Sequence, residues 1–457
     1  MKLVVVGAGI SGLSAAVFAQ REGTELTVLE ASATPGGNVR TDVIDGRCLD
    51  RAANGWLDNE PAMTRLLEKA GLVDQIVRAN DRFGTRWIFA DQKMHPAPLS
   101  PPALVKSSLI PWTAKLRLLL EPFIRRGASG STERDADETV GNFVRRRLGP
   151  WFVDRMVGPM VSGIYAADPD QLSLRGAFPR MFELEREHRS LFLAMLRLRR
   201  GGAPRGHLVT MPGGAGALTQ ALASTLGDRL HCDTPVRSLE KRRQGWRVHT
   251  DHQSFDTDGV ILACPGHVQA RLMQGIDPVA ADALAAIPYA PVAVVVTAWP
   301  KDSFPTPPDG FGVLMARGED RLTKGAEGAL GTVFTSSVFP QQSRPDEVLL
   351  RTILGGGVRP EVAGLDDQAL LQRTLAHLGA CLGTPCRDPA LVHIVRHPQG
   401  IPQYTPGHLD RVRAVRSAEA RNAGLVFCGN HLDGIGVKDC ARAGEVAARR
   451  IYREVGD

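Results

Sequence analysis

The sequence predicts an α/β protein whose nucleotide-binding domain is discontinuous, being assembled from pieces that lie far apart in the chain. Three observations carry this prediction: a glycine-rich turn directly after the first apolar run, a second β-rich run that ends in an acid, and a last apolar strand that leads into a glycine-rich turn and a helix. Between these pieces we expect a mixed-sheet domain and a helical insertion.

Composition and charge restrict the class of protein to which the chain can belong. The chain has 457 residues, of which 43% are hydrophobic and 23% charged, so two or three globular domains are expected. The seven cysteines contain no CxxC pair, which predicts reduced, mostly buried thiols and no zinc ribbon. A net charge of +6 favours an anionic partner such as a nucleic acid, a membrane surface or an acidic small molecule. No unbroken apolar run reaches 18 residues, so no spanning helix is expected.

The chain opens with a strand, a turn and a helix. Lys2–Val6 is short, apolar and rich in β-branched residues, as in a buried parallel strand. It leads into GAGISG at 7–12, a GxGxxG turn, and a helical pattern follows. Gly7 permits the tight bend, Gly9 lets the backbone approach a pyrophosphate, and Gly12 lets the helix pack against the strand. The spacing therefore predicts a dinucleotide site at the positive end of a helix dipole.

A second β-rich run, Glu25–Leu29, ends in Glu30, eighteen residues after the last glycine of the turn. A carboxylate at this place can accept hydrogen bonds from ribose hydroxyls. The pair Gly36 and Gly37 follows, as in FAD oxidoreductases and unlike most NAD-only dehydrogenases. The alternatives, a surface acid and an ordinary glycine turn, fit this order of elements less well. We therefore expect FAD rather than NAD.

The remaining elements alternate between helical and β-rich segments. Helices are expected at 104–126, interrupted by Pro111, and at 139–148 and 151–162, with an apolar run at 191–198. Strands are expected at 232–239, 246–250, 260–264, 292–297, 348–354, 391–395 and 425–428, and a final helix at 438–453.

The predicted domain boundaries follow from this order. Three pieces form the nucleotide domain, at 1–80, 205–265 and 421–457. A short segment of the substrate domain lies at 81–94, the helical insertion at 95–204, and the main part of the substrate domain at 266–420.

Several motifs together resemble the oxygen-dependent protoporphyrinogen oxidase family, within the amine oxidase-like flavoproteins. They are GIYAAD at 163–168, EREHRS at 185–190, PYAPVA at 288–293, GIPQY at 400–404 with Gly407 and His408, and GIGVKDC at 434–440. The resemblance runs along essentially the whole chain. The FAD fingerprint alone would be shared with amine oxidases and phytoene desaturases.

The resemblance implies a Rossmann-like FAD domain, a mixed-sheet substrate domain and a helical membrane-binding insertion. It implies an oxidase acting on CH–CH donors in haem biosynthesis, which takes six electrons from protoporphyrinogen IX to give protoporphyrin IX, with O2 as acceptor and H2O2 as product. It places the protein in the cytoplasm, peripherally on the inner, anionic face of the cell membrane. It also raises ferrochelatase as a partner and a homodimer as an assembly. No metal and no nucleic acid are expected.

The FAD contacts that the resemblance implies fall in seven single positions or short segments. They are Gly7, Ala8, Gly9, Ile10, Ser11, Gly12, Glu30, Gly36, Gly37, Asn38, Ala52, Ala53, Asn54, Gly55, Val236, Asn430, Ile435, Gly436 and Val437. The two alanines replace a glycine and a proline of the family form, so only Asn54 matches there, and Lys438 stands where asparagine is frequent. The flavin carries the chemistry, so no catalytic side chain is expected, and Asn54 is assigned a positioning role.

The implied substrate contacts are Arg86, Gly163, Phe311, Leu314 and Ile353. A guanidinium can bind a propionate through two parallel hydrogen bonds, and the apolar side chains would sandwich the macrocycle. Without the resemblance, the apolar residues would be read as core and the arginine as a solvated charge. For His188 and His408, structural hydrogen bonding is favoured over proton transfer.

Three alternatives remain open at the level of sequence. A coproporphyrinogen III oxidase would perform the same chemistry on a substrate with four carboxylates. A flavin amine oxidase would not need Arg86, and an FAD-holding scaffold would not need the apolar sandwich.

Membrane docking is expected from leucines that alternate with basic residues in the helical insertion. The basic residues are Lys115, Arg117, Arg125, Arg126, Arg197, Arg199 and Arg200. The alternative is that these leucines face a core and the arginines form its solvated edge.

Overall fold

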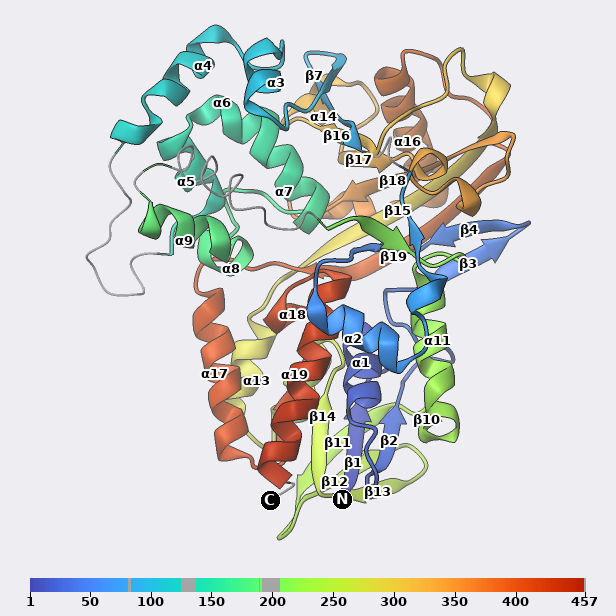
Figure 1. The fold of residues 1–457 in the computed structure, drawn as a ribbon, viewed down its shortest axis with the longest axis vertical. Coiled ribbons are helices and arrows are strands. Elements are labelled where there is room, and N and C mark those ends of the chain that lie inside the picture. The colour runs from blue at the N-terminus through green and yellow to red at the C-terminus, as the bar shows by residue number, and fades with distance from the viewer. Residues whose placement is uncertain (81–83, 125–136, 189, 191–205, 456–457) are drawn as a thin grey trace. The chain divides into compact units, whose positions relative to one another are not determined.

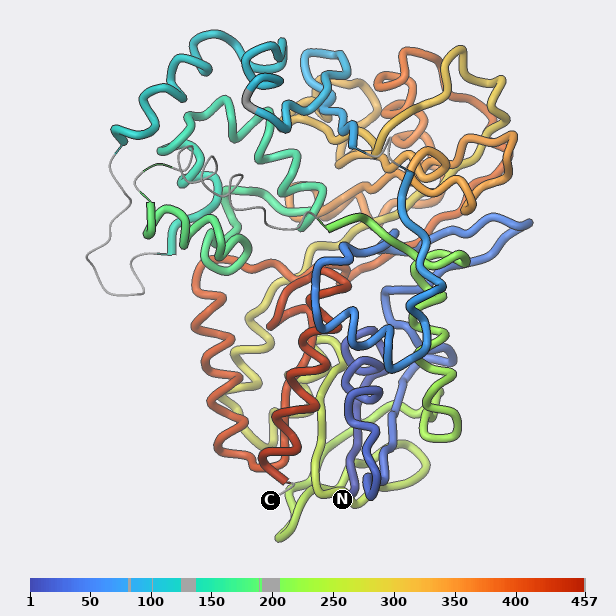
Figure 2. Tube along the Cα trace, viewed as in Figure 1, coloured from blue at the N-terminus to red at the C-terminus, as the bar shows by residue number. Residues whose placement is uncertain are grey.

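The structure is a computed structural model of the 457-residue chain. It describes all residues except 81–83, 125–136, 189, 191–205 and 456–457 (Figure 1). The chain divides into two compact units. Unit 1 comprises Met1–Arg78, Arg205–Pro288 and Leu409–Asp457, and unit 2 comprises Ala79–Pro204 and Tyr289–His408. Both ends of the chain lie in unit 1 (Figure 2).

Unit 1 is built on a parallel five-stranded sheet in the order β10-β2-β1-β14-β20. The strands are β1 (Lys2–Val6), β2 (Glu25–Leu29), β10 (Leu230–His231), β14 (Gly259–Leu262) and β20 (Leu425–Phe427). Val5 at the centre pairs with Val28 on one side and Ile261 on the other, and all three are fully buried. The apolar, β-branched sequence of these strands suits a parallel sheet that is covered on both faces.

Helices cover this sheet, and the closest packing is between α1 (Ile10–Phe18) and α19 (Val437–Val455). A Cβ atom at Gly444 would lie 2.6 Å from the Ser11 carbonyl oxygen, so only glycine allows this approach. The other helices of unit 1 are α2 (Pro61–Lys69), α11 (Gly216–Leu226), α12 (Gly266–Met273), α13 (Pro278–Ala285), α17 (His408–Arg421) and α18 (Asn430–Asp433), with 3₁₀ turns at Val73–Gln75 and Gly227–Arg229.

Three small sheets complete unit 1. They are the hairpin β3 (Thr41–Ile44) and β4 (Arg47–Asp50), the set β5 (Trp56–Leu57), β9 (Leu208–Thr210) and β6 (Val77–Arg78), and the antiparallel set β11 (Val236–Lys241), β12 (Trp246–Thr250) and β13 (Ser254–Thr257).

Unit 2 contains a mixed seven-stranded sheet in the order β19-β15-β18-β17-β16-β7-β8. The strands are β7 (Arg86–Ala90), β8 (Lys93–Pro96), β15 (Tyr289–Pro300), β16 (Gly312–Met315), β17 (Ala329–Val333), β18 (Glu347–Gly355) and β19 (Leu391–Pro402). Only the β16–β7 pair is parallel among the described strands of this sheet. One face packs against α16 (Asp367–Leu382) through Val313, Leu350 and Leu378. Because side chains alternate along a strand, Leu314 and Ile353 belong to the opposite face.

The helices of unit 2 are mostly short. They are α3 (Pro101–Lys106), α4 (Trp112–Leu119), α5 (Val140–Arg147), α6 (Pro150–Phe152), a π-helical turn at Val153–Val157, α7 (Gly158–Tyr165), α8 (Leu174–Ala177), α9 (Pro179–Glu187), α14 (Glu319–Leu322) and α15 (Thr335–Val338), with 3₁₀ turns at Glu121–Phe123, Lys301–Ser303, Pro340–Gln342 and Pro360–Gly364.

A buried ion-pair cluster joins three of these helical segments. Arg147 at the end of α5 is fully buried and lies 2.6 Å from Glu185 of α9 and 3.3 Å from Glu121. Burial by itself opposes ionisation, but hydrogen bonds from Arg146 and Arg147 lower the pKa of Glu185 below its ordinary value.

The expected helix at 104–126 is broken into α3, α4 and a 3₁₀ turn, because Pro111 and Pro122 remove helical N–H donors. Residues 266–288 and 409–420, which the sequence places with the substrate domain, lie in unit 1. Among the described residues, no helix is both long and apolar enough to cross a bilayer.

Candidate flavin and substrate sites

The glycine-rich turn sits at the carboxyl end of β1, and its three glycines differ in what they permit. Gly7 has φ +100°, and a Cβ there would lie 2.9 Å from the Cys264 backbone nitrogen. A Cβ at Gly12 would lie only 1.9 Å from the Gly7 carbonyl oxygen. At Gly9 the nearest protein atom would be the Gly37 Cα at 4.0 Å. Packing therefore requires Gly7 and Gly12, whereas the space beside Gly9 fits a bound pyrophosphate.

Glu30 ends the neighbouring strand and is 8% exposed. Its carboxylate accepts hydrogen bonds from the Ala8 N–H at 2.6 Å and the Ser32 N–H at 2.9 Å. A carboxylate offers about four acceptor positions, so two remain for ribose hydroxyls. The Thr234 N–H donates to the Glu30 carbonyl oxygen at 2.8 Å. This hydrogen bond holds the chain near Glu30 two residues before Val236.

The second glycine pair is bound to the first turn. The Gly36 N–H donates to the Ala8 carbonyl oxygen at 2.8 Å, and Gly36 and Gly37 have φ of +113° and +56°. The structure thus brings the glycine turn at 7–12 together with Gly36 and Gly37.

Asn54 lies between β4 and β5, in the stretch of residues 52–55. Its Nδ2 atom is buried and has no hydrogen-bond acceptor among the described residues. An unpaired buried amide costs about 1–3 kcal/mol, which an oxygen atom of the cofactor would recover. Gly55 has φ +155°, and a Cβ there would lie 2.3 Å from the Val209 carbonyl oxygen. The residues present therefore fit FAD, which Asn54 would help to hold.

The C-terminal segment with expected FAD contacts, residues 430–437, begins where β20 ends, at the same edge of the sheet as the glycine turn and Glu30. The chain passes through α18, Gly434 and residues 435–437 into the start of α19. The carboxyl edge of a parallel sheet is where nucleotides bind in α/β folds, so the topology gathers all segments with implied FAD contacts in unit 1.

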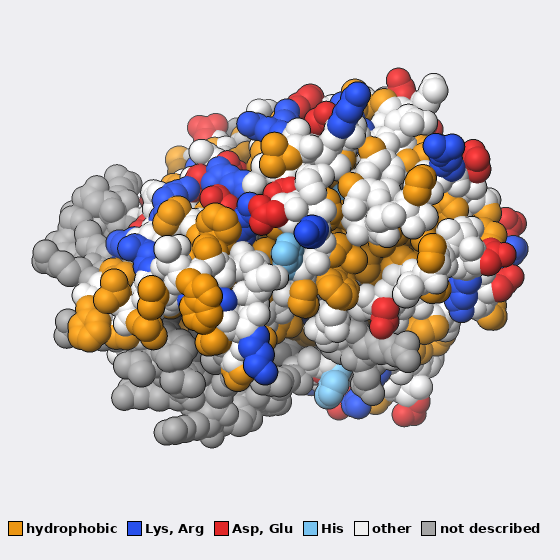
Figure 3. Space-filling model, turned by 90° about the horizontal axis from the view of Figure 1, so that it is seen from above, with side chains coloured by type: hydrophobic (Ala, Val, Ile, Leu, Met, Phe, Trp, Pro, Cys, Tyr) orange, Lys and Arg blue, Asp and Glu red, His pale blue; other side chains and the backbone are white. Residues whose placement is uncertain are grey.

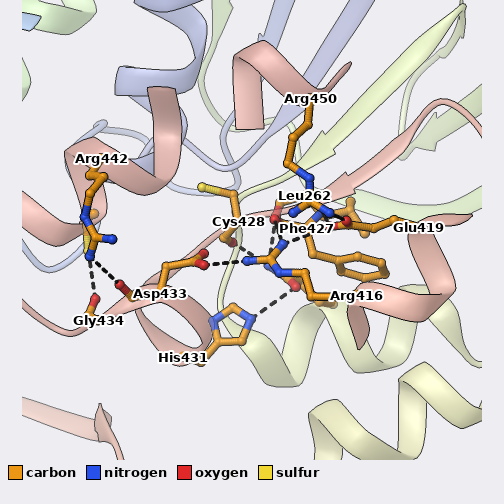
Figure 4. Close-up of polar contacts among 12 residues, drawn as sticks. Leu262, Arg416, Glu419, Phe427, Cys428, His431, Asp433, Gly434, Arg442 and Arg450 are labelled. Atoms are coloured by element: carbon orange, nitrogen blue, oxygen red, sulfur yellow. Dashed lines mark hydrogen bonds and ion pairs between the residues drawn. The ribbon is translucent and has the colours of Figure 1, made fainter. Parts of the chain in front are cut away.

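Arg416 and Glu419 of α17 secure the exposed edge of β20 (Figure 4). The Phe427 N–H donates to Glu419 at 2.9 Å, and Arg416 donates to the Phe427 carbonyl oxygen at 2.6 Å. Arg416 also lies 2.5 Å from Asp433 of α18, and Arg450 pairs with Glu419. An edge strand whose polar groups are satisfied in this way does not pair with further strands.

The residues expected to contact substrate lie together in unit 2. Arg86 pairs with Gly312 across the β7–β16 ladder, and its guanidinium lies over the Phe311 ring at 5.4 Å. Leu314, Gly331 and Ile353 are opposite one another on three adjacent strands. A Cβ on Gly163 of α7 would lie 2.7 Å from Leu314 Cδ2.

Exposure agrees with a binding surface rather than a closed core. Arg86 and Gly163 are exposed, whereas Phe311, Leu314 and Ile353 are half-buried. The arrangement therefore offers a cation beside an apolar surface, which suits a flat apolar acid.

The two histidines considered for proton transfer differ in their surroundings. His408 is 1% exposed and stacks on Tyr404 with ring centroids 4.0 Å apart. His188 is half-buried and lies 3.9 Å from Glu187. Burial and stacking give His408 a place in the packing of unit 2.

Gly331 lies between two of the expected substrate contacts, Leu314 and Ile353, and sequence reasoning missed it. Its φ is +158°, and a Cβ there would lie 2.4 Å from the Val313 carbonyl oxygen and 3.1 Å from Leu314 Cδ2. An isolated glycine in a β-rich run, ALGTV, was the available signal. Arg416, which holds the edge of β20, gave no sequence signal.

Comparisons with known proteins show which family the chain belongs to. The model of the flavin containing amine oxidoreductase family matches residues 10–452. Protoporphyrinogen oxidase 2 of Arabidopsis thaliana is 30% identical, over 98% of this chain and 93% of that protein. Coproporphyrinogen III oxidase of Propionibacterium freudenreichii is 32% identical, over 96% of this chain and 88% of that protein.

Solved structures show the same fold. One from Exiguobacterium sp. superposes with a TM-score of 0.84 at 26% identity, covering 99% of both chains. Cyclohexylamine oxidase from Brevibacterium oxydans, at 18% identity and a TM-score of 0.71 over 100% of this chain and 99% of that one, shares the fold alone. The chain therefore belongs to the flavin containing amine oxidoreductase family and is an oxidoreductase with FAD as its cofactor.

Proposed function

We propose that this protein oxidises protoporphyrinogen IX to protoporphyrin IX in haem biosynthesis. Each macrocycle loses six electrons and six protons in three two-electron steps, and three O2 molecules accept them to give three H2O2. When bound, FAD supplies the two-electron chemistry. The chain's residues bind and orient the substrate and hold the cofactor.

The observation that carries this proposal is the gathering of Arg86, Phe311, Leu314 and Ile353 on one side of unit 2. In the proposal, Arg86 binds a propionate, and the half-buried apolar side chains support the face of the macrocycle. Gly163 keeps α7 close to this surface, since a larger residue would press on Leu314. The named porphyrinogen oxidases among the relatives support the same substrate class.

Coproporphyrinogen III is the second candidate substrate, because one of the relatives over nearly the full chain is named for it. The experiment is aerobic turnover of both porphyrinogens by the FAD-loaded protein, followed by porphyrin fluorescence and O2 uptake. We expect protoporphyrin to appear with three O2 consumed per porphyrin. If only coproporphyrinogen III is turned over, the protein is a coproporphyrinogen III oxidase and the first proposal is wrong. Turnover of simple amines with neither porphyrinogen oxidised would overturn both.

We further propose that unit 2 docks on an anionic membrane surface through an apolar patch on α4 and the 3₁₀ turn that follows it. The large apolar side chains there are strongly exposed: Trp112 67%, Leu116 60%, Leu119 70%, Leu120 58% and Phe123 75%. Figure 3 shows hydrophobic side chains grouped at the left of the view, on the side where Figure 1 places α4. A contiguous apolar patch flanked by Lys106, Lys115 and Arg117 fits a peripheral interface.

The other basic residues expected at this interface lie outside the described residues. They are Arg125, Arg126, Arg197, Arg199 and Arg200. The proposal therefore rests on α4 and its neighbours. Peripheral placement on the cytoplasmic face of the cell membrane, a ferrochelatase partner and a homodimer remain proposals of the same kind.

A further inference from the structure

The helical turn α18 lies between two glycine bends, in the C-terminal segment with expected FAD contacts. It contains only Asn430–Asp433, and its flanking residues Gly429 and Gly434 have φ of +146° and +113°. Glycine bends give the backbone freedom on both sides of the turn. The position of Asn430 and of the following residues 435–437 is therefore set by side chains that hold the turn.

The first anchor is a buried pair formed by Gln269 of α12 and His431 of α18. Both side chains are fully buried, and His431 Nε2 lies 3.1 Å from Gln269 Oε1. The other end of the amide, Nε2, lies 2.8–2.9 Å from three carbonyl oxygens, those of Leu262, Cys264 and Cys428.

The chemistry of these contacts fixes the direction of each hydrogen bond. Three carbonyl oxygens can only accept, so the amide nitrogen of Gln269 must face them and its oxygen must face His431. His431 therefore donates through Nε2–H. The pair ties α18 to the carboxyl ends of β14 and β20, at the edge of the sheet where the cofactor site lies.

The second anchor approaches α18 from α17. Arg416 lies 2.5 Å from Asp433, and the same guanidinium donates to the Phe427 carbonyl oxygen on β20 (Figure 4). Asp433 is the last residue of the turn and His431 the second, so the two anchors hold α18 near both of its ends.

We propose that Gln269 and Arg416 are positioning residues of the flavin site, acting through His431 and Asp433 on the turn that carries Asn430. This inference rests on the expected FAD contacts at Asn430 and at residues 435–437. It assigns a cofactor-related role to four side chains through the contacts that they make with one another and with the ends of β14 and β20. Their loss changes the affinity and the potential of the flavin, beyond any effect on folding.

The test compares His431→Leu, His431→Gln, Asp433→Asn and Gln269→Glu in the full-length protein. FAD affinity is measured by titrating FAD-stripped protein, and the flavin midpoint potential by dye equilibration. We expect His431→Leu to weaken FAD affinity about tenfold, because it leaves Gln269 Oε1 unpaired. His431→Gln should restore most of this loss, because it returns a donor.

Gln269→Glu is nearly isosteric but sets a carboxylate oxygen against three carbonyl oxygens, so we expect it to be the most damaging variant. Asp433→Asn keeps the shape of the second anchor but removes its charge, and we expect it to shift the midpoint potential. If Gln269→Glu yields no folded protein, the other three variants decide the question.

The matched control is His377→Leu in unit 2. His377 is also fully buried and makes one comparable hydrogen bond, 3.0 Å to Thr332 Oγ1. It should lower the melting temperature yet leave FAD affinity and potential unchanged. Wild-type flavin properties in folded His431→Leu and Asp433→Asn, or an equal flavin effect from His377→Leu, would overturn the inference. Because no porphyrinogen is used, absence of porphyrinogen turnover would refute the proposed function and leave this result unaffected.

Discussion

Two regions of the molecule are built in different ways. One is the cofactor cradle of unit 1, which consists of residues 7–12, Glu30 and residues 36–37, and the other is the proposed substrate face of unit 2, which includes Arg86, Leu314 and Ile353. In the cradle, backbone approaches backbone, and glycines at 7, 12 and 36 allow contacts that any side chain would block. The substrate face is made from side chains on β7, β16 and β18, which are distant in the sequence. One site is thus encoded by short local motifs, and the other by the register of a sheet.

This difference predicts different responses to substitution. Backbone contacts of under 3 Å cannot relax by rotation of a side chain, so changes in the cradle should abolish cofactor binding. Side chains on the face can repack, so changes there should alter affinity and specificity by degrees.

The largest effect is expected in the glycine turn. Gly12→Ala would place Cβ 1.9 Å from the Gly7 carbonyl oxygen and should yield protein without FAD. Gly9→Ala should fold normally, since protein atoms leave room for its methyl group, yet lose FAD affinity by about 5- to 150-fold through overlap with the cofactor. Flavin content after gel filtration, together with the melting temperature of the FAD-free protein, measures both effects.

The control for the glycine turn is Gly275→Ala, because a Cβ there would meet no atom within 4 Å. Its flavin content should equal that of the wild type. Stoichiometric FAD in Gly9→Ala would show that the space beside Gly9 is not the pyrophosphate site.

The next effect is expected at Arg86. A hydrogen bond to a charged group contributes about 1.5–3 kcal/mol, so Arg86→Ala should lower kcat/KM by about ten- to over a hundredfold, with an unchanged flavin spectrum. Arg86→Lys should recover only part, because the planar fork is lost. Arg396→Ala is the control, since Arg396 is on the same sheet but pairs with Asp367. Equal kinetics for wild type and Arg86→Ala would remove this residue from the site.

The apolar patch should respond to a charge rather than to a change of volume. Replacing Leu116, Leu119 and Phe123 together by aspartate should abolish sedimentation with anionic liposomes while FAD content stays intact. Leu322→Asp, at another strongly exposed leucine, is the control (71% exposed). Identical sedimentation of the wild type with and without liposomes, at low and high salt, would refute docking.

A smaller effect is expected where α7 meets the sheet. Gly163→Ala would bring Cβ within 2.7 Å of Leu314 Cδ2, the flexible end of a side chain. We expect KM for the porphyrinogen to rise several-fold with the flavin unchanged, and Leu314→Ala in the same chain to relieve part of the effect. Strict additivity of the two changes in a double-mutant cycle would contradict this contact.

The smallest effect concerns acid stability. Complete burial lowers the pKa of His377 from 6.5 to about 4, so the folded state favours the neutral ring. This contribution is complete above pH 6.5 and is lost as the pH falls toward 4, up to about 3 kcal/mol. His377→Gln should therefore weaken the fall in unfolding free energy between pH 7 and 4.5, measured by urea titration. An unchanged pH dependence would argue against this origin.

The sequence was informative where function depends on backbone and spacing. The order of strand, glycine turn, helix and Glu30 predicted the parallel core of unit 1, because packing requires glycine at positions 7 and 12 and the motif shows both. The strand at 246–250 was also predicted with its observed bounds.

Side-chain pairing across long separations was harder to predict. The helix α16 and strands β16 and β17 were missed. The burial of their apolar residues depends on the register of the sheet, which the local sequence does not show. The pairing of Gln269 with His431, 162 residues away, has no local signature at all. The substrate residues were named through family resemblance, and their juxtaposition was visible only once the strands were in register.

The most direct test of the account is anaerobic mixing of the FAD-loaded protein with protoporphyrinogen IX, with the absorption of the oxidised flavin followed in time. The account predicts rapid bleaching of the flavin band, its recovery when air is admitted, and much slower bleaching in Arg86→Ala at low substrate concentration. A flavin band that stays oxidised with both protoporphyrinogen IX and coproporphyrinogen III would contradict the account.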